Sequence, residues 1–141
     1  MAAAWWGTAA LAVTSIAAAI DPHPFGAVAL VVALALFFGG IAAFFAAYVI
    51  AIGRSRESEI GIAAVFGLAG SAPPAVQRSL YANLAVEIAV AVSTAAVRLH
   101  SVLAFGILAV MWGLGMIALW GARHGAFPPR RLPEPRRRGR R

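Results

Sequence analysis

The feature that most constrains this chain is a stretch of 28 residues, Phe25 to Ile52, without a single charged side chain. An α-helix rises about 1.5 Å per residue, so roughly 20 apolar residues cross a hydrocarbon layer about 30 Å thick. Only 12% of the 141 residues are charged and 62% are hydrophobic, whereas soluble domains carry about 25% charged residues. The sequence therefore excludes a water-soluble domain and predicts a membrane-spanning one.

Three other stretches are long and apolar enough to cross a membrane in the same way. We therefore predict an all-α fold, an integral membrane bundle of four transmembrane helices within residues 1–124. The four expected spans are residues 3–20, 25–52, 80–97 and 102–120.

The first expected span also has some features of a signal peptide. It lacks a basic segment in front of it, and the chain continues through Asp21 directly into the next span, which is not the pattern of a cleaved leader. We therefore expect an uncleaved first helix with Trp5 and Trp6 at the membrane interface, where such side chains are enriched.

The net charge of +7 lies entirely at the C-terminal end. Residues 121–141 hold eight arginines and one glutamate, a balance of +7, while the charges of residues 1–120 sum to zero. Because cytoplasmic loops are rich in basic residues, we predict that both termini are cytoplasmic (N-in/C-in) in a bacterial cytoplasmic membrane. Residues 125–141, rich in Arg and Pro, are expected to be a disordered cytoplasmic tail.

The basic tail suits the anionic lipids of the inner leaflet, which attract such segments by about 1 kcal/mol per basic residue. Binding of nucleic acid or of an acidic protein is the alternative, but no aromatic residues alternate with the tail arginines, and no nucleic-acid partner is expected. The lipid contacts are assigned to Arg130, Arg131, Arg136, Arg137, Arg138, Arg140 and Arg141.

The loop between the second and third expected spans, residues 54–78, is predicted to lie on the cytoplasmic side. It contains an apolar stretch, Ile60 to Leu68, which is too short to span a membrane. Pro73 and Pro74 follow it and suit the start of the next helix. Two interpretations remain open: an interfacial helix on the inner leaflet, and a re-entrant segment that lines a cavity.

Polar residues recur along one face of the third expected span. At about 100° per residue they fall within an arc of about 100°, so this face should contact protein or water and not lipid. The members of this polar stripe are Ser79, Asn83, Glu87, Thr94 and Arg98.

Glu87 is the member of the stripe with the clearest chemical meaning. A carboxylate this deep in a membrane costs roughly 2.5–3.5 kcal/mol and suggests a functional site. It either binds a proton or cation between helices, or anchors helix packing through hydrogen bonds. Trp112, near mid-depth in the fourth span, is a possible donor to it, because a buried indole N–H needs a partner.

No catalytic constellation, cofactor site or metal site is expected. Cysteine is absent, and the three histidines, at positions 23, 100 and 124, are read as interfacial side chains. His23 and His100 could share a metal at the outer end, but only Asp21 lies near them in sequence. Within the spans, Gly39, Gly40, Gly113 and Gly115 favour close approach of helices.

The segment Leu103 to Arg131, with the run Leu119-Trp-Gly-Ala-Arg-His-Gly-Ala-Phe-Pro-Pro-Arg-Arg131, resembles small multi-spanning membrane proteins of actinobacteria. A source with a GC-rich genome agrees with twelve Arg and no Lys. The resemblance covers about a fifth of the chain and implies a lineage without implying a mechanism.

In size and in its single membrane glutamate the chain is also similar to the small multidrug-resistance transporters. In that family the glutamate lies in the first helix, whereas Glu87 lies in the third. Members that insert in both orientations have weak charge bias, whereas this chain has a strongly basic tail.

Two functions follow as hypotheses. The first is a non-enzymatic accessory or assembly subunit that packs on a larger membrane complex, with the polar stripe as the buried contact. The second is a small oligomeric transporter coupled to protons or cations through Glu87. A lipid-modifying enzyme is disfavoured because no cluster of His, Asp or Glu lies at one depth.

Overall fold

A computed structural model describes residues 1–129 of the chain, and within them the fold is all-helical with no strand. Four helical segments are long and apolar enough to cross a membrane, which confirms the predicted fold class. The elements are α1 (Ala2–Ile20), α2 (Pro22–Arg54), α3 (Ile62–Phe66), α4 (Pro74–Val97), the 3₁₀ helix η1 (Val102–Ala109) and α5 (Val110–His124). The predicted tail beyond Pro129, with its seven lipid-binding arginines, lies outside the described residues.

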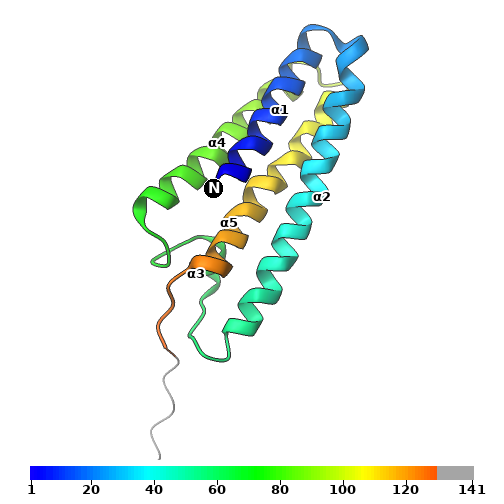
Figure 1. Ribbon diagram of the computed structural model, residues 1–141. Coiled ribbons are helices and arrows are strands. Elements are labelled where there is room, and N and C mark those ends of the chain that lie inside the picture. The colour runs from blue at the N-terminus through cyan, green and yellow to red at the C-terminus, as the bar shows by residue number, and fades with distance from the viewer. Residues whose placement is uncertain (130–141) are drawn as a thin grey trace, which may run out of the picture.

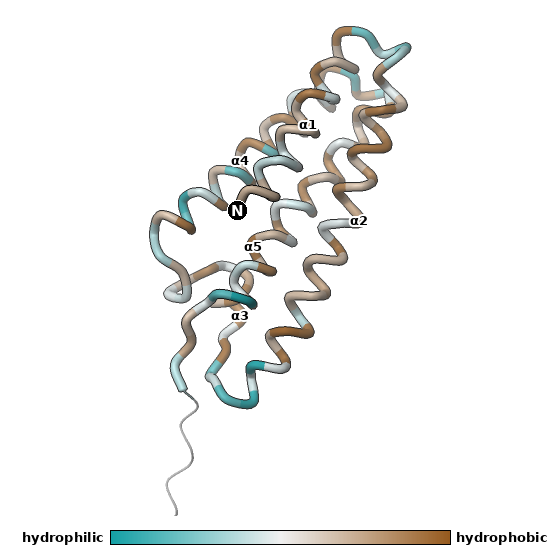
Figure 2. Tube along the Cα trace, viewed as in Figure 1, coloured by the Kyte–Doolittle hydropathy of each residue, from teal (hydrophilic) through white to brown (hydrophobic). Residues whose placement is uncertain are grey.

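The four spans form a ring in which each helix packs against its two neighbours, and α1 also contacts the fourth span, η1 and α5, across the bundle. Around the ring, α1 packs against α2, and α2 packs against the fourth span, which consists of η1 and α5. The fourth span packs against α4, and α4 packs against α1. Figure 1 shows the long helices running side by side, with α2 continuing past the N-terminus of α1. Apolar residues dominate the long helices and hydrophilic ones gather at the turns (Figure 2), as a membrane bundle requires.

Local sequence explains where the helices begin. Asp21 is the only residue between α1 and α2, and its carboxylate accepts the backbone N–H of His23 at 3.3 Å, which caps α2. Pro22 occupies the first turn of α2, where its missing N–H and fixed φ are tolerated. Pro74 plays the same part in α4, so that helix starts six residues before the predicted boundary at Leu80.

The fourth span is not a uniform α-helix. Its first part, η1, is 3₁₀ over eight residues, and α5 continues from it at Val110. Runs of 3₁₀ longer than three or four residues are uncommon. The change from 3₁₀ to α-helix falls near the middle of the span, one turn before Gly113.

Small residues let the helices approach each other, as their positions in the sequence suggested. A Cβ added to Gly40 of α2 would collide with the backbone of Met111, and one added to Gly115 would collide with the backbone of Gly40. Helices in lipid gain stability from such close packing because lipid tails are as apolar as the side chains. The contact therefore fixes α2 against α5.

The apolar stretch between α2 and α4, residues 60–68, packs across the end of the bundle. Val65 and Leu68 are buried at 1% and 0% exposure, whereas Ile62 is 80% exposed. Val65 packs with Ala118 and Ala122, and Leu68, in the left-handed region at φ 53°, packs with Ala4. The stretch thus has one face against α5 and the core and another facing outward.

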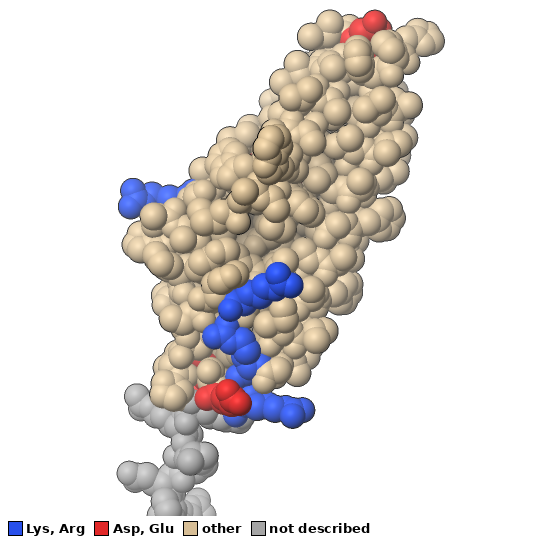
Figure 3. Space-filling view, in the orientation of Figure 1, with Lys and Arg blue, Asp and Glu red and all other residues tan. Residues whose placement is uncertain are grey.

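Charged side chains gather at the two ends of the bundle. Figure 3 shows basic atoms in the lower half, around α3 and the start of α4, with acidic atoms beside them at the lower end and further acidic atoms at the opposite tip. Arg54 at the end of α2 donates to the carbonyls of Ala122 and Gly125, at 2.7 and 2.9 Å, and lies over the Phe127 ring. It thereby satisfies carbonyls that the C-terminus of α5 leaves free.

Candidate functional site

The interior of the bundle contains a polar cluster contributed by three helices. Asn83 and Glu87 of α4 are 1% and 0% exposed, and Thr8 of α1 is 2% exposed. Glu87 lies near the midpoint of α4 and Gly113 near the midpoint of the fourth span. The cluster is therefore enclosed by protein at about the middle of the apolar region.

Glu87 is joined to α5 by a backbone hydrogen bond. Its Oε2 accepts the N–H of Gly113 at 2.9 Å. A Cβ at position 113 would collide with this oxygen and with Leu84, so glycine is what allows the carboxyl group to reach the backbone.

Trp112, expected as the donor to Glu87, has a different acceptor. Its indole Nε1 donates to the carbonyl of Ala4 in α1 at 3.3 Å, and the ring lies against Gly7. Successive residues on a helix point about 100° apart, so Trp112 faces α1 while the Gly113 N–H faces α4. Both bonds bring α5 into contact with its neighbours, but only the second involves Glu87.

Asn83 is joined to α1 by a side-chain hydrogen bond. Thr8 donates from Oγ1 to Oδ1 of Asn83 at 2.9 Å. Thr8 is not among the residues predicted for this site, although its position carries a signal. The residues that follow helical spacing on the buried face of α1 are Thr8, Leu11, Ser15 and Ala18. Two polar residues on the buried face of α1 indicate that α1 meets a polar neighbour.

Two buried polar atoms of this cluster have no hydrogen-bond partner within residues 1–129. They are Nδ2 of Asn83 and Oε1 of Glu87. The first is a donor and the second an acceptor or, when protonated, a donor. Buried polar groups in native proteins are nearly always paired, so the two atoms mark a site that is incomplete in protein atoms alone.

The remaining members of the polar stripe lie apart from this cluster. Ser79 accepts from the Trp5 indole at 3.3 Å near the start of α4, and Thr94 donates to the carbonyl of Val90 in its own helix at 2.8 Å. Arg98, directly after α4, donates to the carbonyl of Ala19 at 3.0 Å and so caps α1. The stripe is thus one buried centre with two interhelical contacts at its ends.

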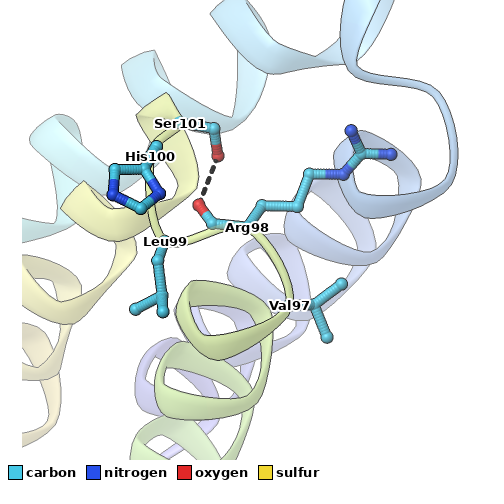
Figure 4. Close-up of a pocket in the computed structure, with 5 residues that line it drawn as sticks. All are labelled: Val97, Arg98, Leu99, His100 and Ser101. Carbon is cyan, nitrogen blue, oxygen red and sulfur yellow. Dashed lines mark hydrogen bonds between the residues drawn. The ribbon is translucent and has the colours of Figure 1, made fainter.

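The end of the bundle at the turn between α4 and η1 carries an open depression lined by residues 97–101. Figure 4 shows the Arg98 side chain pointing toward α1 and His100 pointing away from it, while Ser101 donates to the Arg98 carbonyl at 2.8 Å. Within the described part of the chain no three His, Cys, Asp or Glu residues are grouped to hold a metal ion. The depression therefore offers a single imidazole and no converging ligands.

The geometry defines the class of protein: a multi-pass α-helical membrane protein with a buried polar cluster between α1, α4 and α5. Comparison of the chain with protein-family models, curated proteins and solved structures finds no match. Proposals about function therefore rest on the residues and contacts described above.

Proposed function

We propose that the chain is a non-enzymatic accessory or assembly subunit of a larger complex in the bacterial cytoplasmic membrane, and that it packs on its partner through α2. One observation carries this proposal: the length of the apolar outer face of α2. We define that face by its exposed residues, Val28, Val31, Ala35, Phe38, Ala42, Phe45, Val49 and Ile52.

The outer face of α2 has the geometry of a helix–helix contact. Its residues alternate at spacings of three and four, the spacing that lets one helix pack along another. Large side chains such as Phe38 and Phe45, each 63% exposed, are separated by the small Ala42. Small residues between large ones create the grooves into which a neighbouring helix fits.

The length of α2 also favours a protein neighbour. Its 28 uncharged residues extend over about 42 Å at about 1.5 Å per residue, whereas the hydrocarbon layer is about 30 Å thick. A span that is too long tilts, kinks or locally thickens the bilayer, each at a modest cost in free energy. A partner subunit along α2 would cover the excess apolar length.

The polar stripe is not the proposed contact surface. Its central residues, Asn83 and Glu87, are enclosed by α1 and α5 of the same chain, so a partner cannot reach them. In the subunit hypothesis Glu87 serves the fold, and the residues that meet the partner are on α2.

The test is copurification of partners with a tagged chain expressed at native level in its own host, in mild detergent. We expect a partner at fixed stoichiometry, lost with Ala42→Leu because the added bulk fills the groove between Phe38 and Phe45. The matched control is Ala89→Leu on the exposed side of α4, which should retain the partner. A lone chain or a homo-oligomer in the unmodified protein contradicts the proposal.

A second candidate, an oligomeric transporter coupled to protons or cations, is favoured by a different observation. Glu87 has one oxygen without a partner, and it lies beside the place where the fourth span changes from 3₁₀ to α-helix. Interrupted helices near the bilayer midplane occur at transporter binding sites.

Two substitutions of Glu87 separate the candidates. Glu87→Gln keeps a hydrogen-bond acceptor for Gly113 but cannot exchange a proton, so a subunit tolerates it and a proton-coupled transporter loses coupled flux in liposomes. Glu87→Leu removes the acceptor of the Gly113 N–H. In the first case it should weaken partner association indirectly, by loosening the packing of α4 on α5, and in the second it should abolish flux. If neither property changes with Leu, both roles of Glu87 are excluded.

A further inference from the structure

The two unpartnered atoms of the polar cluster are chemically complementary. Nδ2 of Asn83 is a donor, and Oε1 of Glu87 is an acceptor when the carboxyl group is ionised. Both atoms are buried in side chains that are 1% and 0% exposed. Because the residues are four apart on α4, they occupy consecutive turns of one helix face.

The orientation of each side chain is set by its other hydrogen bond. Oγ1 of Thr8 lies 2.9 Å from Oδ1 of Asn83 and 3.3 Å from the carbonyl oxygen of Ala4. Its single hydrogen serves the shorter bond, to Oδ1, which leaves Nδ2 as the free end of that amide. Gly113 donates to Oε2 of Glu87, which leaves Oε1 as the free end of the carboxyl group. The two free atoms do not bond each other, so something else must join them or one must stay unpaired.

We propose that one water molecule binds between Nδ2 of Asn83 and Oε1 of Glu87. A water that accepts from the amide and donates to the carboxyl oxygen bridges two atoms about 4.7 Å apart, since each hydrogen bond is about 2.9 Å long. The Cβ atoms of residues four apart on a helix are about 5–6 Å apart, which suits that bridge. Buried waters in proteins typically occupy such sites, where polar groups otherwise lack partners.

The bound water completes a hydrogen-bonded chain across three helices. The chain runs from Thr8 of α1 through Asn83 and the water to Glu87 and on to Gly113 of α5. Without the water, the bond to α1 and the bond to α5 are separate. The site is independent of whether the protein acts as a subunit or as a transporter.

The sequence makes this site accessible to a direct measurement. Asn83 is the only asparagine in the chain, so ¹⁵N-asparagine labelling of the full chain in lipid nanodiscs gives one side-chain amide group. We expect magnetisation transfer between water and the Asn83 side-chain amide protons. It should appear as a cross-peak in a rotating-frame experiment, with the sign that a bound water gives. Glu87→Leu should remove this cross-peak, because the water loses its second partner.

Two controls make the experiment decisive. Thr8→Val should keep the water cross-peak, because Thr8 bonds the other end of the amide. Glu87→Gln should also keep it, because a polar terminus remains. A direct hydrogen bond between Nδ2 and Oε1, detected as a coupling from the Asn83 amide to the Glu87 carboxyl carbon, would overturn the proposal. So would an amide turned to face Thr8, or the absence of any water contact in the unmodified chain.

Discussion

Glu87 and Gly113, 26 residues apart in sequence, are joined by a hydrogen bond of 2.9 Å between a side-chain oxygen and a backbone nitrogen. The bond links the middle of α4 to the middle of the fourth span. It depends on the missing side chain at position 113, because a Cβ there would collide with the carboxyl oxygen and with Leu84.

Gly113→Ala should therefore destabilise the bundle. We expect a loss of about 1–3 kcal/mol in the free energy of unfolding, the usual cost of adding a carbon to a filled interior. The measurement is unfolding in mixed detergent micelles followed by circular dichroism. Gly106→Ala is the matched control in the same span, because a Cβ there meets nothing within 4 Å. Equal free energies of unfolding for the two variants would show that Glu87 and Leu84 can move aside for the added Cβ without loss of stability.

The hydrogen bond between Thr8 and Asn83 should stabilise the interface between α1 and α4. Thr8→Val keeps the shape of the side chain but leaves Oδ1 of Asn83 without its donor, and we expect a loss of about 1 kcal/mol. Thr14→Val is the control, since Thr14 bonds only carbonyls of its own helix, those of Ala10 and Leu11. The same unfolding assay applies. If Thr14→Val lowers the free energy of unfolding as much as Thr8→Val does, the hydrogen bond between α1 and α4 has no stabilising role.

Arg54 should hold the C-terminal end of α5 in place. Arg54→Gln shortens the side chain and removes the donors to Ala122 and Gly125, with an expected local loss of about 1–2 kcal/mol. We expect amide hydrogen exchange in residues 121–125 to become about tenfold faster or more, since about 1.4 kcal/mol corresponds to a factor of ten. Arg56→Gln, at an exposed neighbouring position, should leave this exchange unchanged, and faster exchange in both variants would refute a specific cap.

The proposed orientation can be tested because the chain has no cysteine. A single cysteine in place of Ser101 should react with a membrane-impermeant maleimide added outside intact cells. A cysteine in place of Gly61 should react only after the membrane is opened. The positive-inside rule predicts this result, and the reverse pattern would place the termini outside.

Hydropathy was sufficient to predict the spans. In lipid each backbone polar group must be paired within the protein, so a long apolar stretch such as residues 25–52 has few alternatives to a helix. Pro73 and Pro74 were expected to suit the start of this helix, and α4 begins at Pro74. The apolar span was predicted to begin only at Leu80 because Gln77 and Arg78 lower the hydropathy of the first turns. These residues are helical nevertheless, and Gln77 donates from Nε2 to the carbonyls of Leu68 and Ala72, each at 2.9 Å.

The partners of the buried residues could not be derived in the same way. Helical spacing places Asn83 and Glu87 on one face, but it does not say which neighbouring helix faces them. The donor to Glu87 is a backbone N–H of Gly113, and a glycine carries no polar side chain that would draw attention to it. The change from 3₁₀ to α-helix at Val110 likewise leaves no mark in hydropathy, because both halves of the span are apolar.

The hydrogen bonds that fasten α1 to the other helices have a consequence for biosynthesis. Four hydrogen bonds join α1 to later parts of the chain. The pairs are Trp5 with Ser79, Thr8 with Asn83, the Ala19 carbonyl with Arg98, and the Ala4 carbonyl with Trp112. Helix α1 thus bonds residues that are translated 74 to 108 positions after their partners. Until those residues emerge, the least hydropathic of the four spans lacks these bonds, and the insertion machinery must accommodate it while the second half of the chain is translated.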